Sequence, residues 1–98
     1  MEEKEKSFSE ALRDALDLAD VRINEAASEA KVKPLLVSRT INGKSRPRKK
    51  AAQSLTIVGI NALNKRIRGK NDEVKKLREA GTELRQAYVR EYEQTKND

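Results

Sequence analysis

The sequence predicts an all-α protein of about five helices. Apolar residues recur at helical spacing in five segments, and no segment alternates apolar and polar residues as a half-buried strand does. A length of 98 residues leaves room for one small domain with an appendage. We expect frayed residues at 1–6, one helical domain at 7–68 and a C-terminal helix at 71–98.

The first helix is expected from about Ser7 to Ala19. Ser7 and Glu10 have the spacing of a capping box, in which each side chain satisfies the other residue's backbone amide. Six apolar residues then form one face: Phe8, Ala11, Leu12, Ala15, Leu16 and Ala19. A second pattern runs from about Ile23 to Ala30, and its small side chains suit the close approach of another helix.

A third helix is expected from about Pro34 to Ile41. Proline disfavours a helical conformation at the residue before it and fits the first turn of a new helix. Asn42 and Gly43 tolerate positive φ and should end this helix. An extended cationic loop follows at 44–47.

A fourth helix is expected from about Arg48 to Ile67, on a stripe of aliphatic residues. Gly59 lies inside this stripe, and three explanations stay open: close packing, a kink, or a junction between two shorter helices.

The last helix should start near Asn71 or Asp72, which suit an N-cap. Its apolar residues follow heptad spacing over two repeats. Two interpretations stay open. In one, the helix dimerises through a seam; in the other, it packs on its own domain. The seam residues would be Val74, Leu77, Leu84 and Tyr88.

Composition excludes several classes of function. The chain has no His and no Cys, so disulfides, thiolate metal sites and His- or Cys-based catalysis are impossible. No apolar run approaches the ~18 residues of a membrane span, and no signal segment follows the charged start. We expect a cytoplasmic protein that is not an enzyme and uses no cofactor, metal or membrane.

The net charge of +6 is distributed unevenly. Residues 31–70 carry twelve Lys and Arg and no Asp or Glu, whereas residues 1–30 are acidic. Self-repulsion in such a stretch is relieved by a polyanion, which favours a nucleic-acid-binding surface over a merely solvated basic face. No aromatic residue falls in this window, which argues against stacking on single-stranded RNA.

Residues 23–44 have the pattern of a helix-turn-helix. Ala27 is small where the two helices would cross, and Val32 and Val37 are apolar where they would face inward. The string at 37–44, V-S-R-T-I-N-G-K, resembles the V-S-R-x-x-N-G-K pattern of the lac-repressor headpiece. The stretch is also similar to the helix-turn-helix domains of the lambda-repressor/Cro type, which are small all-α bundles.

Three residues depart from the pattern of these families. Lys31 occupies the turn position that is usually Gly, and Lys33 replaces the usual Ser or Thr cap. Thr40 stands where an aliphatic residue is usual.

The resemblance implies that residues 33–39 enter the major groove. Arg39 is the leading candidate to read a base, because a guanidinium can bond both O6 and N7 of guanine. Leu35 would contact a thymine methyl or, alternatively, pack in the core, where we also assign Leu36 and Val37. The base-reading set is Lys33, Leu35, Ser38 and Arg39. The backbone-contacting set is Asn42, Lys44, Arg46, Arg48, Lys49 and Lys50, and the Arg46-Pro47-Arg48 element could instead probe a minor groove.

These expectations converge on a transcriptional regulator, most simply a repressor. It would bind a palindromic double-stranded operator as a homodimer, near the nucleoid when bound. The alternative is an antitoxin-like or adaptor protein whose C-terminal helix binds a protein partner, with DNA binding secondary.

Overall fold

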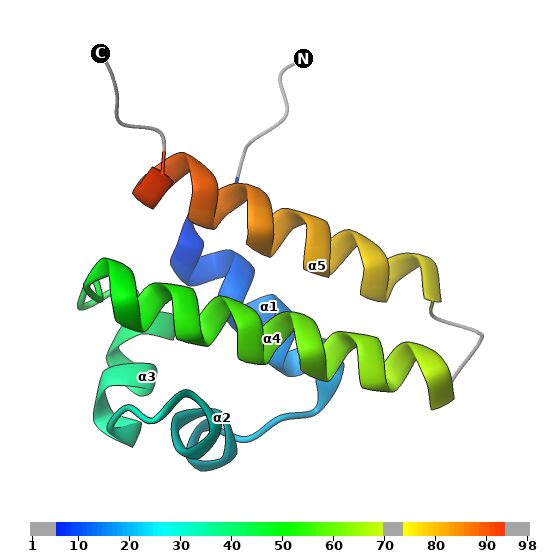
Figure 1. The fold of residues 1–98 in the computed structure, drawn as a ribbon, viewed down its shortest axis with the longest axis horizontal. Helices are drawn as coiled ribbons and strands as arrows, with labels where there is room; N and C mark the ends of the chain where they lie inside the picture. The colour runs from blue at the N-terminus through cyan, green and yellow to red at the C-terminus, as the bar shows by residue number, and fades with distance from the viewer. Residues whose placement is uncertain (1–5, 70–73, 94–98) are drawn as a thin grey trace.

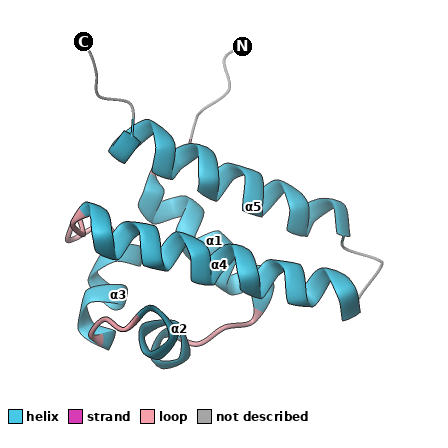
Figure 2. Cartoon of the chain, in the orientation of Figure 1, coloured by secondary structure: helices cyan, strands magenta, loops and turns pink. Residues whose placement is uncertain are grey.

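The computed structural model describes residues 6–69 and 74–93. Within these ranges the chain is helical and contains no strand, which confirms the all-α prediction (Figures 1 and 2). The elements are α1 (Phe8–Ala19), α2 (Ile23–Ala30), α3 (Pro34–Ile41), α4 (Lys49–Gly69), α5 (Val74–Tyr88) and a π-helical turn, η1 (Val89–Glu93).

Helix α1 begins as its capping box predicts. The Glu10 amide donates to Ser7 Oγ at 3.2 Å, and the Ser7 amide donates to Glu10 Oε1 at 3.2 Å. The helix ends at Asp20, whose φ of 60° lies in the left-handed region. All six residues of the predicted apolar face are buried.

Helices α4 and α5 lie side by side and antiparallel, and α1 crosses behind them, while α2 and α3 form the opposite edge of the bundle (Figure 1). The core is continuous across these layers. Its largest fully buried side chains are Phe8, Leu12, Leu55, Leu63, Leu77, Leu84, Val37 and Thr40. Because one core draws on α1, α3, α4 and α5, the C-terminal helix shares its core with the helical domain expected at 7–68.

The apolar seam of α5 faces this core, so the packing interpretation is the one the structure has. Leu77 and Leu84 are fully buried, Tyr88 is nearly so, and Val74 is half-buried at the start of the helix. Three of the four residues assigned to a dimer seam are therefore not free to meet a second copy. The expected start near Asn71 or Asp72 lies outside the described residues.

Gly59 is a site of close packing, and α4 runs unbroken through it. A Cβ at this position would lie 2.7 Å from Leu84 Cδ2, closer than carbon atoms approach. The alternative of a junction between two shorter helices is therefore wrong, because α4 is one continuous helix. The helix extends from Lys49 to Gly69, against the expected Arg48 to Ile67.

Lys6 is fixed, although residues 1–6 were expected to be frayed. Its Nζ lies 2.6 Å from Asp14 Oδ2 and 2.8 Å from Glu83 Oε1, which joins the start of the described chain to both α1 and α5. The prediction for residues 1–5 lies outside the described part of the chain.

Candidate nucleic-acid interface

The turn between α2 and α3 has the backbone geometry that the sequence pattern requires. Lys31 adopts a φ of 61°, in the left-handed region where Gly is usual. The Val32 amide donates to the Ala27 carbonyl at 3.0 Å and closes the end of α2. A non-Gly residue in this region costs on the order of 1 kcal/mol, so surrounding contacts hold the turn in place.

Helix α3 has a buried side and an exposed side. Val37 and Thr40 are fully buried. Thr40 fits this inner position because its Oγ1 donates to the Leu36 carbonyl at 2.7 Å, which satisfies the hydroxyl inside the helix. The start of the helix lacks a side-chain cap at Lys33, as predicted.

The end of α3 is a sharp turn in which only Gly43 takes positive φ, at 74°, while Asn42 does not. The Lys44 amide donates to the Arg39 carbonyl at 2.8 Å across this turn. The cationic loop therefore begins directly at the end of α3.

All four base-reading candidates lie on or beside the exposed side of α3. Lys33, Leu35 and Arg39 are exposed, and Ser38 is half-buried. Leu35 is 58% exposed, so the alternative that it packs in the core is wrong, and Leu36, assigned to the core, is only half-buried. Leu35 is thus an exposed aliphatic side chain on the first turn of α3, in a stretch whose charged residues are all basic.

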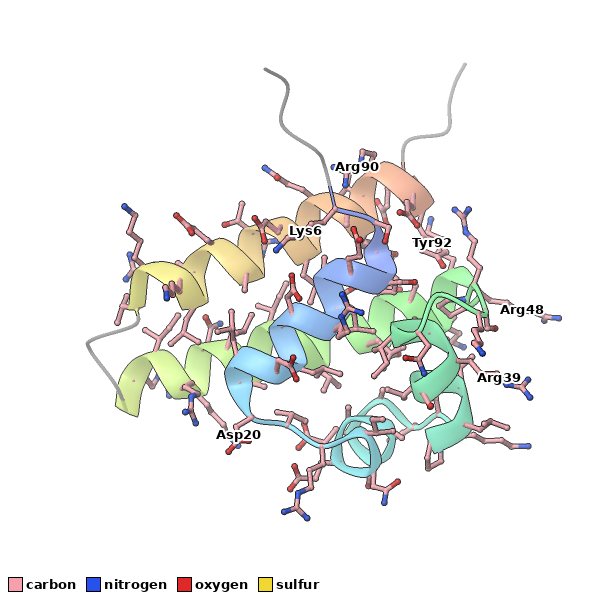
Figure 3. The ribbon with its side chains drawn as sticks, turned by 180° about the vertical axis from the view of Figure 1, so that it is seen from behind. Lys6, Asp20, Arg39, Arg48, Arg90 and Tyr92 are labelled. Atoms are coloured by element: carbon pink, nitrogen blue, oxygen red, sulfur yellow. The ribbon has the colours of Figure 1, made fainter. Side chains whose placement is uncertain are left out.

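Cations from the following loop and from the start of α4 continue this surface. Arg39 of α3 and Arg48 of the loop both project outward on the same side of the molecule (Figure 3). The exposed backbone candidates are Asn42, Lys44, Arg46, Arg48, Lys49 and Lys50. No Asp or Glu occurs in the sequence between Lys31 and Gly69.

The Arg46-Pro47-Arg48 element is not a free arm, which contradicts a minor-groove probe built from all three residues. Pro47 is buried, and its carbonyl accepts a hydrogen bond from the Tyr92 hydroxyl at 2.6 Å. Arg46 Nη2 donates to the Glu91 carbonyl at 2.8 Å, and its guanidinium lies 5.1 Å from the centre of the Tyr92 ring. Arg46 and Arg48 are both exposed, but Arg46 is bonded to η1, whereas Arg48 projects outward (Figure 3).

The aromatic residues form a cluster beneath this loop, which sequence reasoning missed. The Tyr92 ring packs edge-on against Phe8 at 5.6 Å and stacks on Tyr88 at 5.5 Å. The spacing of Tyr88 and Tyr92, four residues apart, was the available signal, since it places both rings on one helical face. Their link to the distant loop at 46–47 had no local signal.

Burial raises the pKa of the Tyr88 phenol, and its hydrogen bond to Glu93 raises it further. Burial also raises the pKa of Tyr92, whereas the neighbouring Arg46 acts to lower it. Both phenols are therefore protonated donors at neutral pH, as the bond from Tyr92 to Pro47 requires.

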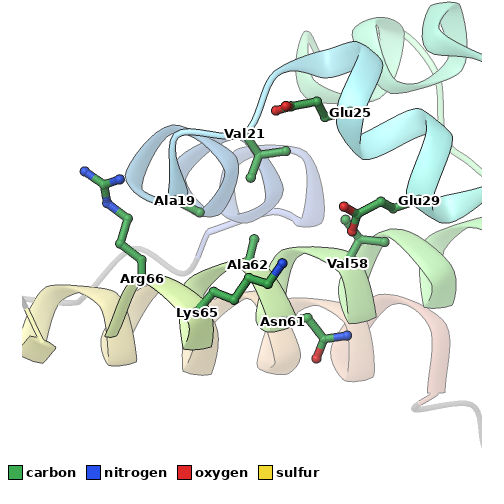
Figure 4. A pocket seen from close by; sticks show the side chains of 9 residues that line it. All are labelled: Ala19, Val21, Glu25, Glu29, Val58, Asn61, Ala62, Lys65 and Arg66. Carbon is green, nitrogen blue, oxygen red and sulfur yellow. The ribbon is translucent and has the colours of Figure 1, made fainter. Parts of the chain in front are cut away.

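A cleft of about 340 Å³ lies on another face, between α2 and α4. Glu25 and Glu29 of α2 and Asn61 and Lys65 of α4 are among the residues that line it, and the Arg66 side chain extends away from α2 (Figure 4). No group of three or more metal-ligating side chains occurs in residues 6–69 and 74–93. No helix in these ranges is long and apolar enough to cross a membrane.

Comparison of the chain with protein-family models, with curated proteins and with solved structures found no match.

Proposed function

We propose that this protein is a sequence-specific, double-stranded DNA-binding regulator of transcription that uses α2 and α3 as a helix-turn-helix. The observation that carries the proposal is the two-sided character of α3. It buries Val37 and Thr40 and exposes Lys33, Leu35 and Arg39 in a stretch without acidic residues. An α-helix with its side chains is about 10–12 Å in diameter, which fits the roughly 12 Å width of the major groove.

Different residues would supply specificity and affinity. Arg39 would read a guanine through two hydrogen bonds, with Lys33 and Ser38 beside it. The exposed cations Lys44 and Arg48 would neutralise phosphates and fix the register of the protein on the duplex. Lys49 is a weaker phosphate candidate, because its Nζ lies 3.9 Å from Glu93 Oε2.

The mode of regulation that fits such a small protein is occupation of an operator, which favours repression. One short helix reads few base pairs, so two copies on a palindromic site would give the specificity that one lacks. Because Leu77 and Leu84 are buried within the chain, such a pair would be held by another surface or by the DNA itself.

The alternative, an adaptor protein, needs a C-terminal helix that is free to bind a partner, and the burial of Leu77, Leu84 and Tyr88 gives it no support.

The test begins with selection of a binding site from random duplex DNA. Binding of Arg39→Ala and Arg48→Ala is then measured on the selected site and on random DNA across a salt series. Arg39→Ala should lose about 1–3 kcal/mol of discrimination at one or two base pairs. Arg48→Ala should weaken binding to both DNAs alike and reduce the salt slope by about one.

Two results would contradict the proposal. If selection enriches no site at about 0.15 M salt, the adaptor alternative is favoured instead. If both variants shift the selected and the random DNA equally, Arg39 does not read a base.

A further inference from the structure

The loop that joins α3 to α4 is held by the opposite end of the chain. Three contacts reach it from η1: the Glu91 carbonyl accepts from Arg46 at 2.8 Å, the Tyr92 ring lies under the same guanidinium at 5.1 Å, and the Tyr92 hydroxyl donates to the Pro47 carbonyl at 2.6 Å. We call Arg46, Pro47, Glu91 and Tyr92 the clasp.

The clasp rests on the core rather than on a loose terminus. The Glu91 carboxylate accepts a hydrogen bond from the backbone amide of Phe8, in the first turn of α1, at 2.9 Å. Tyr92 is packed between Phe8 and Tyr88. Arg90 donates to the carbonyl of Lys6, which is itself paired with α1 and α5. The position of η1, and with it the position of the loop, is therefore set by the bundle.

The loop residues divide by orientation. Pro47 is buried, whereas Lys44, Arg46 and Arg48 are exposed. Of these three cations, Arg46 has its guanidinium turned toward η1 by the bond to the Glu91 carbonyl. If Arg46 moved to a phosphate, it would leave the Glu91 carbonyl and the Tyr92 ring without their partner. A fixed loop, by contrast, presents its flanking cations without losing conformational freedom on binding.

We propose that Arg46 is a positioning residue, held by Glu91 and Tyr92 so that Lys44 and Arg48 face the DNA backbone. This inference rests on the proposed function. It reassigns Arg46, which sequence analysis placed among the phosphate contacts, and it gives the C-terminal turn a part in DNA binding although that turn lies outside the basic stretch.

The test compares Arg46→Gln with Arg48→Gln, which remove the same charge from the same loop. Both variants should weaken binding to duplex DNA, Arg46→Gln by about 3- to 10-fold through the lost ordering of the loop. They should differ in salt dependence. Arg48→Gln should reduce the slope of log K against log salt by about 0.9, as the loss of one phosphate contact does, while Arg46→Gln leaves that slope unchanged.

A measurement without DNA tests the positioning directly. NMR order parameters of the backbone amides at 45, 46 and 48 should fall in Arg46→Gln and stay unchanged in Arg48→Gln. Tyr92→Phe keeps the ring and the charge and removes only the hydroxyl bond to Pro47, so it should lower the same order parameters. The pKa of Tyr92 should rise in Arg46→Gln and not in Arg48→Gln, because Arg46 is the group that lowers it.

The outcomes separate this inference from the function on which it rests. If the wild-type chain binds no DNA, the proposed function fails and this inference fails with it. If wild-type binds and Arg46→Gln reduces the salt slope as much as Arg48→Gln, Arg46 is a phosphate contact and only the inference is overturned. Unchanged order parameters in both Arg46→Gln and Tyr92→Phe overturn it as well.

Discussion

The two glycines inside the long helices should respond in opposite ways to the same substitution. Gly59 lies in α4 and Gly81 in α5. Replacing a glycine by alanine in a helix interior stabilises the helix by about 1 kcal/mol, so propensity alone predicts that both variants gain stability. The surroundings of the added methyl group decide whether that gain survives.

At Gly81 the added Cβ would lie 3.6 Å from Leu63 Cδ1, an ordinary van der Waals contact, and the gain should be kept. At Gly59 it would lie 2.7 Å from Leu84 Cδ2, with Ala15 and Leu12 carbons at 3.8 Å. Leu84 is fully buried, so the added methyl group can be accommodated only if this side chain shifts within the core. Overpacking of this kind costs about 1–3 kcal/mol.

We therefore expect Gly81→Ala to raise the free energy of unfolding by about 1 kcal/mol and Gly59→Ala to lower it by up to about 2 kcal/mol. In a domain of this size 1 kcal/mol corresponds to about 4–8 °C in Tm. Urea and thermal unfolding followed by circular dichroism at 222 nm would measure both. If Gly59→Ala stabilised the protein as much as Gly81→Ala, the close approach of α4 to α5 would be refuted.

Two further predictions concern the DNA surface and the alkaline limit of stability. Leu35 is exposed beside the other base-reading candidates, so replacing the thymine that it contacts by uracil should weaken binding about fourfold. This factor corresponds to roughly 0.8 kcal/mol for the lost methyl group. The Leu35→Ala variant should bind both DNAs equally, and a preference for thymine that persists in this variant would assign the methyl contact to another residue. Hydrogen bonds to Asp14 and Glu83 raise the pKa of Lys6, and burial raises that of Tyr88. Because both folded-state values lie above the unfolded ones, stability should be complete below about pH 10 and fall as pH rises through them. Urea midpoints between pH 8 and 11 would show this decline, which should be shallower in Tyr88→Phe, and midpoints that stay level to pH 11 would contradict it.

The elements with a local cause were predictable from sequence. The capping box, the break at Pro34 and the stop at Gly43 act over three or four residues, and each begins or ends a helix as expected. Lys31 was predicted in the turn, and its left-handed backbone follows from that position. Asp20 takes the same conformation without a sequence signal.

The surface against which an apolar helix face packs was not predictable, because the spacing of apolar residues indicates only that the face is buried and not what buries it. The heptad spacing in α5 is compatible both with a dimer interface and with packing inside the bundle. The burial of Leu77 and Leu84 within the chain decides for packing. The core alternative for Leu35 is wrong for the same reason. Its spacing fits a core position, but α3 turns a different side inward.

The sequence by itself determined the helical class, the positions of most helix ends and the stretch without acidic residues, since these depend on local propensity and on charge order along the chain. Only the tertiary structure decided that two exposed cations of one loop are held differently. Arg46 and Arg48 are two residues apart and chemically identical, yet Arg46 is bonded to the Glu91 carbonyl, 45 residues away, and lies over the Tyr92 ring, whereas Arg48 projects outward (Figure 3). Contacts over that separation form when the bundle closes, and no local pattern encodes them.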